Sequence, residues 1–366
     1  GESLAGGLAA AVHPLVVSWT MTFRGGAVAF LGGCLLLGAW KRLSRRPEPA
    51  LGVVFGLGLA LLANSRPFEG AVFSLPPALL LLADWRRNAR ALAAGAAVVA
   101  AAAAWMLYYN WRITGDPWLM PYMLHEQTYS LYPPFVWQDP RPAPKFGHRL
   151  LHSFHVGWEF GYFQSLRSPS GFIRETAYKL WILIEAYLGA PLLALPLWAA
   201  LSRSARDKET ANLAKYGALF VAATMGAVWS NPEYVAPGAG LFFLLVALGL
   251  RRLGAFQLRA VAFGSVLSAF LFPRFIILFS TGTKRPPIEA SLAEKGVKQL
   301  VAVSYGRDHY PHDEWVYNGA DIDSQPVVWA HSLSPASDRE LALYFKDREA
   351  RHLLVEVTTP ERGSRR

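Results

Sequence analysis

The sequence predicts a mainly α-helical polytopic membrane bundle of about eight or nine spans, followed by a small C-terminal α/β domain. Three observations predict this fold class. The 366 residues are 53% hydrophobic and only 17% charged, whereas a soluble domain carries about 25% charged residues. Residues 91–109 contain no charge, and about twenty apolar residues span a bilayer. From about residue 286 the composition changes to that of a soluble domain.

The candidate spans are apolar stretches separated by charged or turn-forming residues. Several are short, particularly 70–83, where Pro76 and Pro77 favour a kink, a tilt or local thinning of the bilayer. Glycines between residues 25 and 38 allow close approach of helix backbones. We predict spans at residues 3–20, 25–40, 50–65, 70–83, 91–109, 177–201, 216–230, 234–250 and 260–280.

Four basic clusters predict how the chain is threaded through the membrane. They are residues 41–46, 86–90, 203–215 and 251–259, with fourteen Lys and Arg residues in total. Positive charge in short loops marks the cytoplasmic face. The outer elements are then loops 18–24, 65–69, 230–233 and 110–176, together with the C-terminal domain. Lipid headgroups and topology explain the net charge of +10, so we expect membrane lipids and no nucleic acid as partners.

Three regions follow from these patterns. Residues 1–285 form the predicted membrane domain, residues 286–360 a small soluble α/β domain, and residues 361–366 a disordered end. The long outer loop is dense in aromatic residues, which suits the headgroup interface or a loop that covers a lipid or a sugar. Within this loop, residues 148–163 are compatible with a short helix on the surface. In the soluble domain we predict strands at 299–305, 326–331 and 352–357, and a helix at 335–345 capped by Ser334 or Ser337.

Ionisable residues in the outer loops are the candidate binding residues. Arg66 and Glu69 lie in a tight turn at the bilayer edge, where an unused charge is costly. Arg66 is suited to a phosphate, with Glu69 orienting it, although a local ion pair between the two would also explain them. His125 and Glu126 lie among aromatics and suit a polar headgroup or proton transfer, or serve as plain surface residues.

Two further sites complete this set. Glu233 and Tyr234 occupy another short outer loop, and the two short loops are predicted to face one cavity. Arg274, near the outer end of the span at 260–280, either binds a lipid phosphate or snorkels to the interface.

Metal and nucleotide sites have weaker signals. His148, His152 and His155 share one face of a predicted helix, one turn before Glu159, and residues 308–314 mix several ligand types. A divalent cation remains open as a cofactor, although histidines at a membrane interface are more often plain surface residues than metal ligands. No G-x-S-x-G, Walker, H-E-x-x-H or dinucleotide-binding pattern occurs, so the sequence indicates no nucleotide site. The single cysteine, Cys34, excludes an intramolecular disulfide.

Several segments resemble a group of bacterial polytopic proteins similar to the GT-C class of membrane glycosyltransferases. They are GGAVAFLGGCLLLGAW, ANSRPFEG, NWRITGDPWLMPYMLHEQTY and YGRDHYPHDEWVYNGADID, and the resemblance runs from about residue 25 to 357. The class includes protein O-mannosyltransferases and aminoarabinose transferases. The resemblance implies a multi-pass protein of the bacterial inner membrane that transfers a sugar from a polyprenyl-phosphate donor on the extracytoplasmic side.

The resemblance also implies an acidic base in the first outer loop, which we expect upstream of Gly1. No catalytic residue is therefore carried over to this chain. Two positions depart from the group: Phe23-Arg24 stands where a Tyr-Trp pair is usual, and Glu233-Tyr234-Val235 where His-Tyr is usual.

Two other function classes fit the same sequence. Kinked spans interrupted by glycine and proline suit a lipid or solute transporter, for which Lys179, Glu185 and Arg274 are the interior ionisable candidates. A non-catalytic membrane scaffold would depend on the C-terminal domain instead.

Overall fold

The structure is a computed structural model of the whole chain. It describes residues 2–22, 24–188, 193–202, 207–257, 259–261, 263–264, 267, 285–306, 309 and 313–355. The chain divides into two compact units. The helical unit comprises Gly1–Arg141 and Tyr162–Phe275, and the α/β unit comprises Pro142–Gly161 and Ile276–Arg366.

The helical unit is built from helices joined by short turns. Prolines at the first helical positions start many of them, because proline fixes a helical φ and needs no hydrogen-bond acceptor there. The helices are α1 (Glu2–Ala11), α2 (Pro14–Thr20), α3 (Gly26–Leu43), α4 (Pro49–Ser65), α5 (Pro67–Ala83), α6 (Trp85–Thr114), α7 (Pro121–Tyr129), α10 (Pro169–Tyr187), α11 (Ala194–Ser202), α12 (Lys208–Thr224), η4 (Ala236–Gly238) and α13 (Ala239–Leu250).

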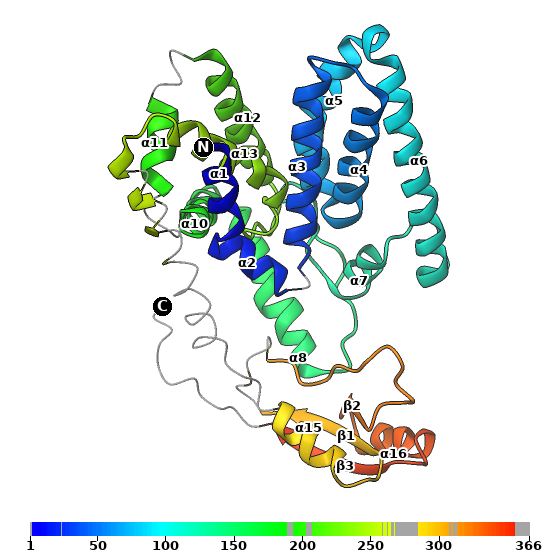
Figure 1. Cartoon of the computed structure of the whole chain (residues 1–366). Coiled ribbons are helices and arrows are strands. Elements are labelled where there is room, and N and C mark those ends of the chain that lie inside the picture. Colours follow the sequence, from blue (N-terminus) through cyan, green and yellow to red (C-terminus); the bar gives the residue numbers. More distant parts are fainter. Residues whose placement is uncertain are drawn as a thin grey trace. The chain divides into compact units, whose positions relative to one another are not determined.

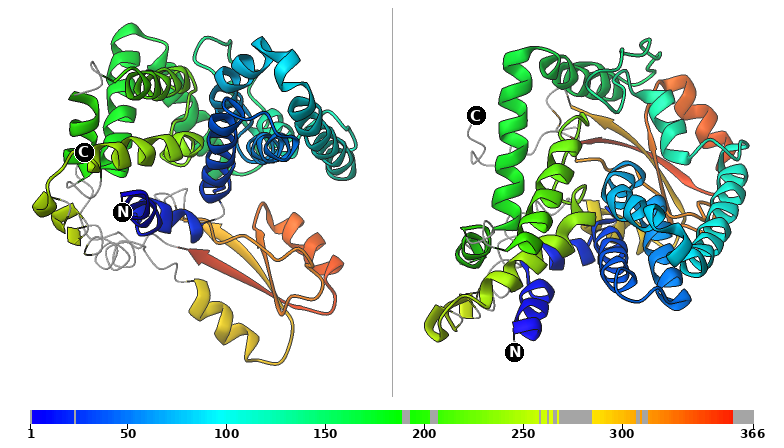
Figure 2. Two further views of the ribbon diagram at one scale, coloured as in Figure 1. Left: turned by 45° about the horizontal axis from the view of Figure 1, so that its top comes forward. Right: turned by 90° about the horizontal axis from the view of Figure 1, so that it is seen from above.

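Glycines bring α3, α4, α5 and α6 into close contact (Figures 1 and 2). A Cβ at Gly52 in α4 would lie 2.0 Å from the Ala91 carbonyl oxygen in α6. A Cβ at Gly33 in α3 would lie 2.0 Å from the Pro237 carbonyl oxygen in η4. No side chain larger than hydrogen fits these positions without moving a backbone.

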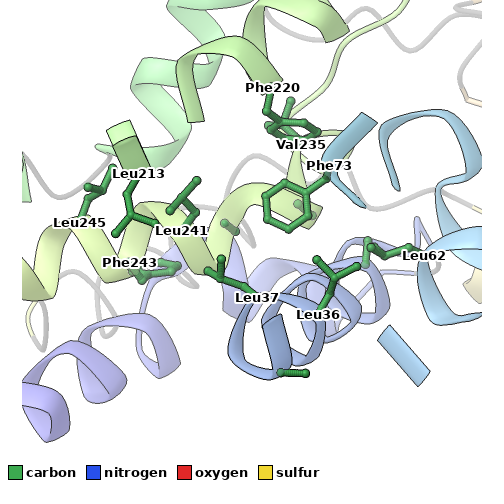
Figure 3. Close-up of a cluster of buried hydrophobic side chains, with 14 of the residues drawn as sticks. Leu36, Leu37, Leu62, Phe73, Leu213, Phe220, Val235, Leu241, Phe243 and Leu245 are labelled. Atoms are coloured by element: carbon green, nitrogen blue, oxygen red, sulfur yellow. The ribbon is translucent and has the colours of Figure 1, made fainter. Parts of the chain in front are cut away.

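A buried apolar cluster holds the rest of the unit together (Figure 3). Leu36 of α3, Phe73 of α5, Phe220 of α12 and Leu241 of α13 all contribute to it and are almost fully buried. Phe73 packs edge-to-face on Phe220 with ring centroids 5.2 Å apart, a favoured arrangement for aromatic pairs. The core therefore links helices that are far apart in sequence.

The predicted bundle of eight or nine spans is wrong. In the described part of the chain, two helices are long and apolar enough to cross a membrane, α3 and α6. Pro14 divides the predicted first span into α1 and α2, and the predicted span 177–201 falls on two helices, α10 and α11. α13 has twelve residues, a length typical of a buried core helix. The predicted span 260–280 lies mostly outside the described residues.

α6 has the strongest membrane character of the described helices. Only 11% of the most apolar stretch of α6 is buried inside the protein, against 44% of the corresponding stretch of α3. Its thirty residues extend over about 45 Å, which matches a bilayer with its headgroups. Trp105 and Trp111 are exposed near its C-terminal end.

The first two basic clusters meet where α3 ends and α6 begins. Arg87, in the first turn of α6, donates hydrogen bonds to the Ser44 and Arg45 carbonyl oxygens just after α3, at 3.2 and 3.1 Å. The two candidate spans therefore have their basic ends together.

The α/β unit is a three-stranded parallel sheet with flanking helices. Its strands are β1 (Gln299–Tyr305), β2 (Val327–His331) and β3 (Glu349–Val355), in the order β2-β1-β3. Its helices are α8 (Arg149–His152), the π-helix η1 (Ser153–Glu159), α15 (Arg285–Ala293) and α16 (Pro335–Tyr344). A last short helix, α9 (Phe160–Leu166), begins in this unit and ends in the helical unit.

β1 is the central strand and supplies much of the core of the α/β unit. Gln299 pairs with Val327 of β2 and with Glu349 of β3. Val303 is fully buried with Trp329 in a small apolar cluster. The predicted strands and helix lie close to the observed ones, and Ser334 caps α16 by accepting a hydrogen bond from the Ser337 N–H at 3.1 Å. The unit also includes residues 142–161, which the sequence analysis placed in the long outer loop of the membrane domain.

Candidate functional site

The turn between α4 and α5 positions Arg66. α4 ends at Ser65, Arg66 adopts φ −143° and ψ 76°, and Pro67 begins α5. Proline disfavours helical geometry at the residue before it, so the chain turns at Arg66. Gly70 allows the tight return, because a Cβ there would lie 2.7 Å from the Leu62 Cβ. The local sequence thus places Arg66 between the C-terminal end of α4 and the N-terminal end of α5.

The Arg66 guanidinium joins two other loops. It lies 4.1 Å from the centre of the Tyr234 ring, a cation–π contact, and its Nη2 donates a hydrogen bond to the Arg24 carbonyl oxygen. The Arg66 Nε is buried and has no hydrogen-bond partner among the described residues. A buried donor without a partner costs about 1–3 kcal/mol, so this N–H is suited to a bound acceptor.

Glu233 reaches the same place from the loop before η4. Its Oε1 lies 3.2 Å from the Arg24 Nη1, and the Glu233 side chain is 9% exposed while that of Arg24 is 71% exposed. The carboxylate therefore holds one edge of the Arg24 guanidinium and leaves its other donors toward solvent. We call Arg24, Arg66, Glu69, Glu233 and Tyr234 the arginine cluster.

Glu69 is the buried carboxylate of this cluster. It lies in the first turn of α5 and is 8% exposed. Burial raises the pKa of Glu69, and the Arg66 charge opposes this shift only in part. Burial also raises the pKa of Tyr234, against the effect of Arg66. Both side chains are therefore held in an environment that disfavours negative charge on them.

A small pocket opens beside the cluster. It has a volume of about 290 Å³ and lies between the end of α4, the start of α5, α6 and α7. Its walls include the aromatic side chains of Trp105, Tyr109 and Tyr122 and the amides of Asn64 and Asn110. Burial raises the pKa of Tyr122, and the nearby Glu69 and Glu126 charges add to this shift. Tyr122 in the pocket wall is therefore close enough to Glu69 of the arginine cluster to be affected by its charge.

The structure places His125 and Glu126 on α7. The Arg141 Nη1 lies 3.9 Å from the Glu126 Oε2 and donates to the Glu126 carbonyl oxygen at 2.9 Å. The His125 ring lies 5.0 Å from that of Tyr129. Arg141 and Tyr129 therefore contact these two residues, whereas the pocket is lined by Pro121 and Tyr122 from the start of the same helix.

The predicted residues thus have different outcomes. The structure brings Arg66, Glu233 and Tyr234 together from two loops, with Glu69 close by. The Arg66 guanidinium contacts Tyr234 and Arg24 instead of forming the local ion pair with Glu69. Arg274 lies outside the described residues. Arg24 and Tyr122 are not among the residues predicted from the sequence, although Arg24 is the lone cation of its short loop.

The predicted histidine face is wrong. His148 precedes α8, and the chain then changes to the π-helix η1, so the spacing of an α-helix is lost. The His155 Nδ1 instead lies 2.7 Å from the Glu159 Oε2. Of the predicted metal segment at 308–314, only His309, Asp313 and Glu314 are described. No three His, Cys, Asp or Glu side chains of the described residues are arranged around one ion as they stand.

Comparisons with protein-family models, with curated proteins and with solved structures found no match.

Proposed function

We propose that this chain is a membrane glycosyltransferase that moves a sugar from a polyprenyl-phosphate donor to an extracytoplasmic acceptor. The observation that carries the proposal is the arginine cluster. Two guanidinium groups lie in adjacent loops, and one has a buried Nε without a partner. Arginine N–H groups bind phosphate through short charge-assisted hydrogen bonds. The cluster is therefore suited to the phosphate of a lipid-linked donor.

The neighbouring pocket is suited to the sugar. Aromatic faces provide apolar contact, and the Asn64 and Asn110 amides provide donors and acceptors for hydroxyl groups. The pocket shares Pro67 with the turn that carries Arg66. A sugar linked to a phosphate at Arg66 would thus reach the pocket over a short distance.

We place the protein in the bacterial inner membrane as a multi-pass protein, with the arginine cluster and the α/β unit on the extracytoplasmic side. The basic residues of α3 and α6 support this orientation, because they meet at the end that the positive-inside rule assigns to the cytoplasm. The exposed tryptophans near the C-terminal end of α6 suit the opposite interface.

The test is sugar transfer by the protein reconstituted in liposomes with a labelled polyprenyl-phosphate-linked sugar. We expect label to leave the lipid, and Arg66→Ala to slow its release at least tenfold. Arg112→Ala is the matched control, because Arg112 is an exposed arginine in the last turn of α6, outside the arginine cluster. Absence of transfer, or equal rates for wild type and Arg66→Ala, would refute the proposal.

A lipid transporter is the second candidate. An apolar cavity of about 360 Å³ lies between α10, α11, α12 and α13, with Tyr187, Phe220 and Val235 among its lining residues. Its walls are suited to a hydrocarbon chain. Movement of a labelled lipid between leaflets of proteoliposomes, without release of the sugar, would favour this function over transfer.

A further inference from the structure

A second group of ionisable side chains lies in the α/β unit, at the carboxyl ends of its parallel strands. β1 ends at Tyr305 and β2 ends at His331, which pairs with Val303 in the register of the sheet. Open parallel sheets bind ligands at this edge. Glu314 follows β1 in the connection to β2, and His148 comes from the segment before α8. We call His148, Tyr305, Glu314 and His331 the histidine cluster.

Two donors hold the Glu314 carboxylate in place. Its Oε1 accepts hydrogen bonds from the Tyr305 hydroxyl and, at 2.6 Å, from the Val316 N–H. Its Oε2 faces the His331 Nε2 at 3.6 Å. That distance is too long for a good hydrogen bond. It is close to the separation of about 3.4 Å between two ligands of a tetrahedral zinc ion, which follows from bond lengths of about 2.0–2.2 Å.

His148, in the segment before α8, is the fourth member of the histidine cluster. Its ring centroid lies 4.7 Å from that of His331 and 6.2 Å from that of Tyr305. The Nδ1 atoms of His148 and His331 are both buried, and neither has a hydrogen-bond partner within the described residues.

Other side chains of this edge are already engaged. His309 stacks on Tyr305 with ring centroids 4.2 Å apart, and its Nε2 lies 2.7 Å from the Asp313 carbonyl oxygen. Among the described residues of this edge, these contacts leave His148, His331 and Glu314 as the side chains that can share one ion.

We propose that the histidine cluster binds a divalent transition-metal ion of the zinc type. Ring nitrogens of His148 and His331 and the Glu314 Oε2 are the protein ligands, and water or a substrate oxygen takes the fourth position. Two imidazoles and one carboxylate favour zinc over magnesium or calcium, which prefer oxygen ligands. A rotation of the His148 side chain is needed to bring the three ligands around one point.

Tyr305 and the Val316 N–H act in this site as positioning groups. They bind the Glu314 oxygen that does not face the ion, and such outer contacts fix ligand geometry in metal sites. The site is independent of the arginine cluster, because every residue named for it belongs to the α/β unit.

The test is zinc binding by the full chain after removal of metals with a chelator. Dialysis against Zn²⁺, followed by elemental analysis, is expected to give one bound ion per chain. Titration against a chromophoric chelator is expected to show at least tenfold weaker binding for His148→Ala, His331→Ala and Glu314→Gln. His331→Gln keeps most of the side-chain volume and should lose affinity equally.

His352→Ala is the matched control. His352 lies in β3 of the same sheet and is exposed, and its Nε2 lies 2.8 Å from the Ser304 Oγ. We expect this variant to bind zinc like the wild type, and circular dichroism verifies that each variant is folded. Absence of stoichiometric zinc, or zinc retained equally by His331→Gln, His148→Ala and the wild type, would overturn the proposal.

Discussion

The arginine cluster and the histidine cluster both combine a fixed carboxylate with buried nitrogen atoms that have no partner, yet they suit opposite charges. Arg66 remains protonated at any physiological pH and can only donate, so its buried Nε calls for an acceptor. His148 and His331 are bases whose neutral form offers a lone pair, so a ring nitrogen of His148 and the His331 Nε2 that faces Glu314 are suited to a cation. The comparison teaches that the protonation chemistry of the nitrogen determines which ligand a cluster favours.

The two clusters also differ in what holds them together. The arginine cluster joins loops from three parts of the helical unit, so its geometry depends on helix packing. The histidine cluster is carried by two adjacent strand ends, the connection between them and the segment before α8. Variants can therefore disturb one cluster and leave the other intact.

The largest effect is expected from Gly33→Ala. The new Cβ would lie 2.0 Å from the Pro237 carbonyl oxygen, so η4 and the preceding loop with Glu233 and Tyr234 must move. Overpacking of this kind costs about 1–3 kcal/mol or more. We expect a lower melting temperature and loss of polyprenyl-phosphate binding, while zinc binding persists.

Gly38→Ala on the same helix is the control for this prediction. The nearest atom to its new Cβ is the flexible end of Arg42 at 3.2 Å, so we expect a change in melting temperature close to zero. Equal destabilisation by both variants would contradict the packing that we describe.

Tyr305→Phe is expected to affect only the histidine cluster. The variant removes one of the two donors to Glu314 and keeps the ring. Loss of such an outer contact weakens metal binding about 10–100-fold, which zinc titration measures. Polyprenyl-phosphate binding should stay unchanged, and a parallel loss of both activities would show that the clusters are not separate.

Tyr234→Leu tests the cation–π contact in the arginine cluster. Such contacts are worth about 0.5–1 kcal/mol at exposed sites and more when desolvated. We expect polyprenyl-phosphate affinity to fall about two- to fivefold, because Arg66 loses the ring that orients it. Tyr234→Phe retains the ring and should bind like the wild type, and an equal loss in both variants would rule out this role for the ring.

The smallest effect, and one that depends on pH, is expected for Glu69→Gln. Burial raises the pKa of Glu69 in the folded state, so the protonated carboxyl contributes to the stability of the folded chain. This contribution to stability is lost as the pH rises through the raised pKa. The variant should therefore melt at a higher temperature than the wild type above that pH, and the difference should shrink in acid. Glu48→Gln, at an exposed position, should show no such trend, and a pH-independent difference for Glu69→Gln would contradict the burial effect.

The sequence was most informative in the α/β unit. The buried apolar run at residues 299–305 and the sequence around Ser334 predicted β1 and the start of α16, because local propensity and capping act over a few residues. The inclusion of residues 142–161 could not be predicted, since it depends on contacts between segments far apart in the chain.

Apolar length misled the prediction in the helical unit. Hydropathy alone does not separate a span from a buried core helix, and α13 is apolar because it lies in the core. The prediction that the two short outer loops face one cavity made a contact between Arg66 and Tyr234 understandable. The position of Arg24 could not be predicted in this way. A single exposed arginine has no sequence pattern that reveals its partner, and Glu233 lies far away in the chain.

The central claim is that Arg66 belongs to a site for a lipid-linked phosphate. Binding of polyprenyl phosphate and of uncharged polyprenol to the protein in lipid nanodiscs tests it most directly. Hydrogen bonds to charged groups are worth about 1.5–3 kcal/mol, so Arg66→Ala should weaken polyprenyl-phosphate binding at least tenfold without changing the affinity for polyprenol, and His331→Ala should change neither. Equal binding of polyprenyl phosphate by the wild type and Arg66→Ala would contradict the account.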